Sequence, residues 1–402
     1  MATTWDNRDS ERADYASARK LQEEVLEARR LLGEEHPDTL KAMAHLALTL
    51  KAQCDRVSAR KLQEQVLEMR RRLLGEEHPD TLAVMSDLAG TLYAQGDLAG
   101  ARRLEELVLS TRRCLLGEEH PDTLSAMSNL AVVLNAQGDW AGARKLKEQV
   151  LEARRRLLGE EHPDTLAAAT NLAATLHAQG DLAGARKFQE QALAGCLRVL
   201  GEEHPDTLKA VNNLAATLLA QGDREGARKL QEQVLGARRR LLGEEHPDTL
   251  TAMHNLAGTL YAQGDLAGAR KFQEQALEAR RRLLGEEHPL TLSTMNNLAA
   301  TLYTQGDLAA ARKFQEQALE ARRRLLGEEH PDTLWAMSNL AGTLYAQGDL
   351  MGARKLQEQV LEARRRLLGE EHPDTLTAKN NLARMKPRTL RHWRRLLFGQ
   401  KQ

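Results

Sequence analysis

The sequence predicts an all-α protein built as a solenoid of stacked helical hairpins. The octapeptide GEEHPDTL first occurs at residues 33–40 and recurs every 42 residues up to residues 369–376, with Leu290 in place of the aspartate in one copy. A period in this range, sustained over most of a chain, is the signature of a protein built of stacked repeats. Between successive octapeptides the apolar residues recur at helical spacing, and glycines divide each unit in two. Each unit therefore reads as two helices.

The unit at residues 247–285 shows why two helices are expected. Pro247 suits a first helical position, where its missing N–H would have no partner anyway. Gly264 ends this helix A, because glycine adopts the left-handed cap conformation at least cost. Asp265 then caps helix B, which runs to Gly285. Neither helix can bury its apolar stripe alone, so the hairpins must stack.

This pattern predicts the organisation of the whole chain. Residues 1–13 are expected to be a flexible N-terminus and residues 14–385 the solenoid. The solenoid is expected to contain an unpaired N-terminal helix B, eight hairpins and a ninth helix A. Residues 386–402 form a basic C-terminal tail that we expect to cap the exposed end. The prolines that open helices A are Pro37, Pro79, Pro121, Pro163, Pro205, Pro247, Pro289, Pro331 and Pro373.

Two departures from the repeat are expected to have local effects. Cys54 replaces the glycine that caps helix A in the other hairpins, which predicts a strained or shifted turn. Gly195 lies within a predicted helix B, where glycine costs about 1 kcal/mol relative to alanine. The segment around Gly195 is therefore a candidate flexible point, or an extra apolar contact patch.

The motif positions of the repeat resemble the tetratricopeptide repeat in its 42-residue form, which is similar to the repeats of kinesin light chains and of many bacterial regulatory proteins. This resemblance covers residues 14–383 and implies a right-handed superhelix, with helix A lining the inner face and helix B the outer face. Leucine, methionine and glutamine replace some motif aromatics, so a kinesin-specific function is not carried over. The motif positions in register are Met295, Leu298, Ala299, Leu302, Gly306, Asp307, Ala311, Ala318 and Leu319. At four motif positions the residue type differs from the usual aromatic: Met295, Leu302, Gln273 and Gln315.

A nearly constant asparagine on helix A is the first candidate site. A carboxamide both donates and accepts hydrogen bonds, so a row of them can grip the backbone of an extended peptide. In related repeats asparagine at this position contacts peptide ligands. The alternative is that each amide satisfies polar groups of a neighbouring helix. The row consists of Asn129, Asn171, Asn213, Asn255, Asn297, Asn339 and Asn381.

Other positions on helix A vary from unit to unit, and in the fold that the chain resembles they line the groove. Free variation at a solvated surface is one interpretation, and recognition of a single extended ligand is the other. Aromatic residues at these positions concentrate in the C-terminal half, which we therefore favour as the main binding surface. The candidate residues are His254, Asn296, Tyr261, Tyr303, Trp335 and Tyr345.

Catalytic, cofactor and metal sites are not predicted. The sequence contains no GxxxxGK[ST] or GxSxG motif, and its cysteines fit neither a disulfide framework nor a metal spacing. The nine His-Pro pairs lie one per loop, whereas a metal site needs several converging ligands. A structural turn explains every copy, and we expect no small-molecule substrate.

The net charge of zero gives no global attraction to nucleic acid or membrane. The N-terminus lacks the apolar stretch of a signal peptide, which predicts a cytoplasmic protein. The tail is the exception, and it has three interpretations: a cap over the exposed end, attachment to nucleic acid or an anionic membrane, or contact with the acidic body of another copy. Its candidate charged residues for attachment are Arg388, Arg391, Arg394 and Arg395.

The predicted function is non-enzymatic. We expect a scaffold or adaptor that holds an extended segment of another protein in the groove lined by helix A. The alternatives are a recognition or sensor module that acts in trans with a nucleotide-driven regulatory protein, and attachment to nucleic acid or membrane through the tail.

Overall fold

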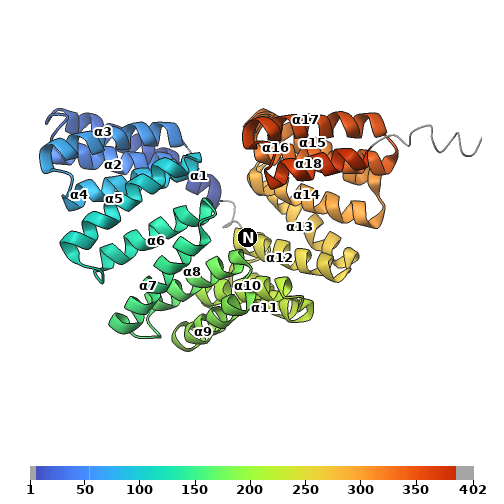
Figure 1. Cartoon of the computed structure of the whole chain (residues 1–402), viewed down its shortest axis with the longest axis horizontal. Coiled ribbons are helices and arrows are strands. Elements are labelled where there is room, and N and C mark those ends of the chain that lie inside the picture. Colours follow the sequence, from blue (N-terminus) through green and yellow to red (C-terminus); the bar gives the residue numbers. More distant parts are fainter. Residues whose placement is uncertain (1–5, 54, 386–402) are drawn as a thin grey trace, which may run out of the picture. The chain divides into compact units, whose positions relative to one another are not determined.

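A computed structural model describes residues 6–53 and 55–385, with side chains from residue 18 onward. The described residues form eighteen α-helices and contain no β-strand, which confirms the predicted all-α class (Figure 1). Even-numbered helices are helices A and odd-numbered ones are helices B. The helices are α1 (Asp6–Arg30), α2 (Pro37–Ala52), α3 (Arg56–Leu74), α4 (Pro79–Gln95), α5 (Leu98–Leu116), α6 (Pro121–Ala136), α7 (Trp140–Leu158), α8 (Pro163–Gln179), α9 (Leu182–Leu200), α10 (Pro205–Ala220), α11 (Arg224–Leu242), α12 (Pro247–Gln263), α13 (Leu266–Leu284), α14 (Pro289–Gln305), α15 (Leu308–Leu326), α16 (Pro331–Gln347), α17 (Leu350–Leu368) and α18 (Pro373–Arg384).

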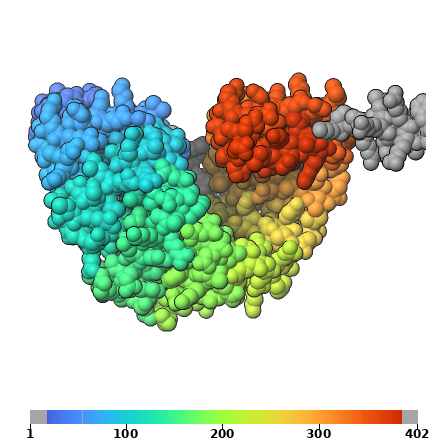
Figure 2. Space-filling view, viewed as in Figure 1, coloured from blue at the N-terminus to red at the C-terminus, as the bar shows by residue number. Residues whose placement is uncertain are grey.

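The chain divides into two compact units, residues 1–221 and residues 222–402. Within each unit consecutive helices pack against one another, so successive hairpins form successive bands in the space-filling view (Figure 2). Neighbouring helices A also touch each other, at α2/α4, α4/α6 and α8/α10 in the first unit and at α12/α14 in the second. Contact between neighbouring helices A is expected of the inner layer of a curved stack, so these helices provide the inner face of each unit.

The structure shows a capping residue that the sequence analysis missed. The histidine of each octapeptide is the N-cap of helix A, and its ring accepts a hydrogen bond from the backbone two residues later. At α12, Nδ1 of His246 accepts from the N–H of Asp248 at 3.1 Å, and Pro247 occupies the first turn. The repeated histidines therefore have a structural role at the start of helix A.

The turn between helices A and B is formed as expected. Gly264 has φ 88° in the left-handed region and ends α12. Oδ1 of Asp265 then accepts a hydrogen bond of 2.9 Å from the N–H of Gly268, which caps α13. A Cβ at Gly268 would lie 2.5 Å from Oδ2 of Asp265, so a larger residue there requires the aspartate side chain to shift; the equivalent caps at Ser58 and Ala310 have hydrogen bonds of 3.1 Å.

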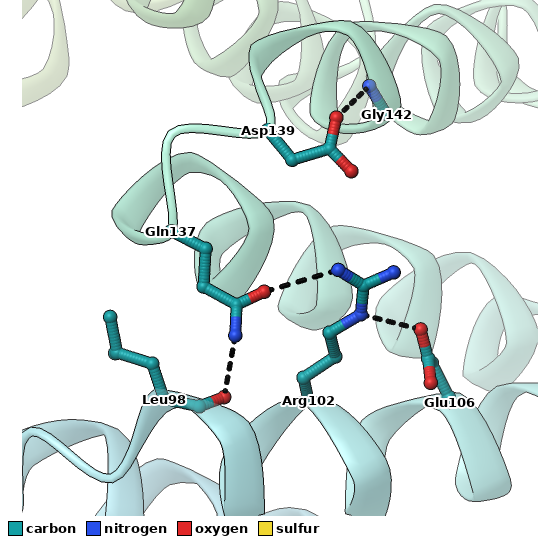
Figure 3. Close-up of polar contacts among 6 residues, drawn as sticks. All are labelled: Leu98, Arg102, Glu106, Gln137, Asp139 and Gly142. Carbon is teal, nitrogen blue, oxygen red and sulfur yellow. Dashed lines mark hydrogen bonds and ion pairs between the residues drawn. The ribbon is translucent and has the colours of Figure 1, made fainter.

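A glutamine at the end of helix A fastens several hairpins to the preceding one (Figure 3). Nε2 of Gln137 donates to the carbonyl oxygen of Leu98 at 3.2 Å, and its Oε1 accepts from Nη1 of Arg102 at 3.3 Å. Arg102 also pairs with Glu106 on α5 at 2.7 Å. The same glutamine contact to a helix B carbonyl recurs at Gln95, Gln221, Gln263 and Gln347.

The arginine runs at the ends of helices B are paired locally. In the first run, Nη1 of Arg70 donates to the carbonyl oxygen of Asp80 at 2.7 Å, and Arg71 lies 3.3 Å from Glu76. Arg72 reaches back to Glu35 in the preceding loop. The ion pairs are largely solvent-exposed, so each contributes about 1 kcal/mol or less. Their main effect is to hold the loops in register.

Two rows of alanines, one on helices A and one on helices B, belong to the most deeply buried part of the core. These alanines are essentially inaccessible to solvent. Any larger side chain would separate the helices, because protein cores are close-packed. The rows are Ala47, Ala89, Ala131, Ala173, Ala215, Ala257, Ala299 and Ala341 on helix A, and Ala59, Ala101, Ala143, Ala185, Ala227, Ala269, Ala311 and Ala353 on helix B.

At the ends of the chain, one boundary differs from the expectation and other expectations lie outside the described residues. Helix α1 begins at Asp6, so part of the segment expected to be flexible has helical backbone. The expected strain at Cys54 and the expected capping role of residues 386–402 both lie outside the described residues. The organisation of residues 14–385 as one solenoid domain stays a prediction, beside the observed division at residue 221.

Gly195 lies at a close approach between helices, which supports the interpretation of this segment as a contact patch. A Cβ at Gly195 in α9 would lie 2.5 Å from Cδ2 and 3.1 Å from Cδ1 of the buried Leu166 in α8. Gly236 in α11 differs, because the nearest such atom is Nη1 of Arg240 at 3.9 Å. Close packing against Leu166 therefore accounts for glycine at position 195, whereas no comparable contact accounts for glycine at position 236.

These two glycines give a matched pair of substitutions. Gly236→Ala should raise the free energy of unfolding by about 1 kcal/mol, from helix propensity alone. Gly195→Ala should instead lower it by about 1 kcal/mol, because overpacking against Leu166 outweighs the propensity gain. Urea unfolding followed by circular dichroism measures both, and equal stabilisation by the two alanines would show that α8 and α9 tolerate the extra methyl.

Candidate protein-binding surface

The asparagine row lies on the helices A of both units. In the first unit, α6 and α8 carry exposed asparagines and α10 carries a half-buried one. In the second unit, α12, α14, α16 and α18 each carry a half-buried one. The structure therefore places the row on the inner layer of each unit: Asn129, Asn171 and Asn213 in the first, and Asn255, Asn297, Asn339 and Asn381 in the second.

Two members of the row contact the neighbouring hairpin. Nδ2 of Asn297 lies 3.2 Å from Nε2 of His254, which joins α14 to α12. Asn129 hydrogen-bonds the carboxyl group of Glu105, which joins α6 to α5. These asparagines satisfy polar groups of neighbouring helices, as one interpretation expected. Their partial exposure leaves them accessible from the inner face as well.

Three tyrosines form a second row, at the C-terminal ends of α12, α14 and α16. Tyr261, Tyr303 and Tyr345 are 38%, 41% and 41% exposed. The hydroxyl of Tyr261 lies 2.9 Å from Oγ1 of Thr304, and that of Tyr345 donates to the carbonyl oxygen of Arg384 at 3.4 Å. Two of the rings are thus held by the next helix A while much of their surface stays exposed.

Trp335 stands at the opposite end of α16 from Tyr345. Its side chain is 45% exposed, and the guanidinium of Arg322 lies over its ring at 5.6 Å. Arg322 is itself buried, which lowers its pKa, and its Nη1 donates to the carbonyl oxygen of Asp332 at 3.1 Å. Trp335 is therefore a braced aromatic residue separate from the tyrosine row.

His254 and Asn296 occupy equivalent positions on α12 and α14, but they differ in access. His254 is half-buried, and its pKa is lowered by burial and then by the charge of Arg280. Asn296 is only 4% exposed, and neither atom of its carboxamide has a hydrogen-bond partner. The structure therefore places Asn296 beneath the inner surface, where a ligand would not contact it without movement.

Glu105 is a buried acid that the sequence analysis missed. It is 2% exposed, and Oε2 lies 3.5 Å from Oγ of Ser86 on α4. Burial is the main cause that raises its pKa to about 7; the charge of Arg112 and hydrogen bonds with Ser86 and Asn129 oppose this rise, and the charge of Asp87 adds a smaller one. Asp87 replaces the asparagine of the row in this hairpin, and burial raises its pKa also.

Lys147 occupies the same position one hairpin later. It is 7% exposed, and burial lowers its pKa to about 8. Its Nζ donates to Oγ1 of Thr175 at 2.7 Å and to the carbonyl oxygen of Asn171 at 3.1 Å. The ammonium group therefore fastens α7 to α8.

A signal for both residues was present in the sequence. The position is glutamine in the other hairpins, at Gln63, Gln189, Gln231, Gln273, Gln315 and Gln357, all of them buried. A charged residue at a position that is otherwise glutamine marks a hairpin whose inner surface differs from the rest. The charged residue is visible when the hairpin sequences are aligned at this helix B position.

Two further features of the described residues concern ions and membranes. No three or more His, Cys, Asp or Glu side chains come together there in a way that could hold a metal ion. In that part of the chain, every helix is too short or too polar to cross a lipid bilayer.

Stacked helical hairpins with a chemically varied inner layer define an α-solenoid repeat protein, a class that serves as a scaffold for protein interactions. Two family models, both described as tetratricopeptide repeat, match the chain. One matches residues 10–72, 43–113, 122–198, 164–240, 206–282, 248–324 and 296–351, and the other residues 333–374. The chain therefore belongs to the tetratricopeptide repeat family, whose fold is typically that of a non-enzymatic scaffold.

Solved structures of several other proteins are similar to this chain. BtubC (BKLC) from P. vanneervenii is 24% identical, with a TM-score of 0.50 over 58% of this chain and 94% of that chain. The apo form of RapI is 13% identical, with a TM-score of 0.52 over 71% of this chain and 98% of that chain. The nearly identical TPR-like repeats of a Podosopora anserina protein, described as a putative kinesin light chain, are 32% identical, with a TM-score of 0.47 over 52% of this chain and 99% of that chain. No curated protein sequence matches the chain.

The buried acid makes stability depend on pH in a defined direction. Folded Glu105 keeps its proton up to about pH 7, whereas in the unfolded chain it ionises near its ordinary value of 4.5. Its contribution to stability is therefore complete below pH 4.5 and declines as the pH rises towards 7. Glu105→Gln should raise the free energy of unfolding by about 2–3 kcal/mol at about pH 8, and by little at about pH 4.

Urea unfolding of the wild type and the variant at both pH values measures this difference. The matched control is Glu106→Gln, next in sequence, whose exposed carboxylate pairs with Arg102 at 2.7 Å. This control should change stability by less than about 0.5 kcal/mol at either pH. An equal effect of Glu105→Gln at the two pH values would contradict a raised pKa.

Proposed function

We propose that the chain is a scaffold that holds an extended segment of a partner protein against the inner face of α12, α14, α16 and α18. The observation that carries this proposal is the row of partly exposed tyrosines, two of them anchored to the next helix A. On this proposal the protein acts by binding and not by catalysis.

The anchored tyrosines support binding because they are ordered before a ligand arrives. Fixing a free side chain at an interface costs about 0.5–1.5 kcal/mol. The hydroxyl contacts of Tyr261 and Tyr345 have already met part of this cost. About 40% of each ring remains exposed, and large aromatic residues of this kind dominate the energetics of many interfaces.

Small residues lie between the asparagine and tyrosine rows and leave room for a ligand backbone. Gly258 on α12 follows Asn255 by one turn and precedes Tyr261 by one turn, so the three share a face. A Cβ at Gly258 or at Gly342 on α16 would meet no other atom within 4 Å. The space between the rows is therefore open at these two helices.

The asparagines supply contacts that do not depend on the sequence of the ligand. A peptide backbone offers alternating donors and acceptors, and a carboxamide matches both. Asn297, Asn339 and Asn381 recur once per hairpin on the inner layer. An extended segment that crosses several hairpins would meet one carboxamide at each, and its side chains would be read by the variable positions.

Selection of peptides from a display library on the immobilised full chain tests the proposal. A selected peptide should bind the wild type and lose about tenfold or more in affinity to Tyr303→Ala/Asn339→Ala/Tyr345→Ala, because each truncation removes contact area at the centre of the surface. Fluorescence anisotropy gives the dissociation constants, and circular dichroism checks that the variant is folded.

The matched control changes the opposite layer of the same hairpins. Lys313→Ala/Lys355→Ala lies on exposed positions of α15 and α17 and should leave the affinity unchanged. If selected peptides bound the triple variant as tightly as the wild type, the inner face of α14 and α16 would not be the binding surface.

A further inference from the structure

The two ends of the described solenoid are complementary halves of a repeat. Within the described residues, no helix A precedes α1, which is a helix B, and no helix B follows α18, which is a helix A. Every complete hairpin between them pairs these two kinds of helix. We propose that α18 of one copy packs on α1 of a second copy, so that the joint reproduces a hairpin and the chains associate head to tail.

Exposure at the two ends shows which surfaces lack a partner. Val25 on α1 is 38% exposed, whereas its equivalents Val66 and Val360 on α3 and α17 are inaccessible. Leu376 on α18 is 39% exposed, whereas its equivalent Leu334 on α16 is 3% exposed. Each end therefore shows to solvent the apolar positions that a hairpin partner covers elsewhere, and burying such surface favours association.

The charges at the two ends also match. In the hairpin α16–α17, Met337 and Gln359 line the same pocket, and Met127 and Gln149 line its equivalent at α6–α7. At the proposed joint the methionine position is Lys379 and the glutamine position is Glu24. These two positions carry a basic and an acidic side chain only at the two ends of the chain, where they would meet.

The acidic residues around this pocket explain why a cation is needed at position 379. The pocket at α16–α17 contains one cation, Arg366, which pairs with Glu329. Helix α1 has one arginine fewer than the other helices B and lacks the equivalent of Arg366. Lys379 restores a single cation to the pocket from the helix A side, where it faces Glu24 and the flanking acids of α1.

The same charges favour a second copy over the chain's own tail as the cover of α18. Residues 386–402 contain six lysines and arginines and no acid, so they would bring like charge to Lys379. Helix α1 instead brings Glu23, Glu24 and Glu27. The joint is heterologous, because different surfaces of the two copies meet, so repeated association gives a ring or an open filament.

Charge reversal on the full-length chain tests the joint by sedimentation velocity over a wide range of protein concentration. The wild type should associate as its concentration rises. Glu24→Lys or Lys379→Glu alone should weaken this association about tenfold or more, because like charges then face each other. An equimolar mixture of the two variants should associate again, since every joint between unlike copies pairs opposite charges.

The matched control is Lys20→Glu on α1, at a position that is exposed in every other helix B, and it should associate like the wild type. A wild type that stays monomeric at all concentrations would overturn the proposal. So would association that resists both reversals, or a mixture that fails to recover. Sensitivity to Glu24→Lys but not to Lys379→Glu would also overturn it, because it would indicate a symmetric contact between two α1 helices.

Discussion

The burial of two alanine rows between helices A and B is the constraint on which the rest of the structure depends. Ala257 and Ala269 are inaccessible to solvent, and a larger side chain at either position would push the helices of the hairpin apart. The leucines and methionines on either side then interdigitate, and their positions fix where the next hairpin packs. Because the contact is repeated at constant spacing, any irregularity has to be absorbed in loops or at the ends. This explains why the cap residues of the loops are as regular as the core.

Regularity of this kind makes the fold predictable from sequence and the site less so. Pro247, Gly264 and Asp265 act through local backbone chemistry, so their roles as first-turn, end and cap residues followed from the sequence, and the structure confirms them. The cap role of His246 was missed because histidine is an unusual N-cap, and its spacing to Asp248 carries no general signature. Local rules therefore gave the helices, while the choice of cap needed coordinates.

The candidate surface shows the opposite balance. The sequence placed the asparagine and tyrosine rows on helix A, but it could not separate Asn296, which is buried, from His254, which is half-buried at the equivalent position. That difference in exposure depends on how each side chain packs against the neighbouring helices, which is a tertiary property. Glu105 and Lys147 were missed for a related reason. Their significance lies in burial, and a charged residue on a helix reads as solvated until its neighbours are known.

In a repeat protein, each internal repeat buries apolar surface against its neighbours. A terminal repeat lacks one neighbour, so it exposes to solvent the apolar surface that internal repeats bury. One solution is to make the end polar, and another is to make the two ends fit each other. The exposed Val25 and Leu376 show that apolar surface persists on the first and last described helices, α1 and α18. The exchange of methionine for Lys379 and of glutamine for Glu24 makes the ends polar and, in the same step, makes them complementary. Lys379 and Glu24 oppose non-specific aggregation, because burying either charge without a partner costs free energy. They permit one specific contact, in which each charge meets the opposite charge.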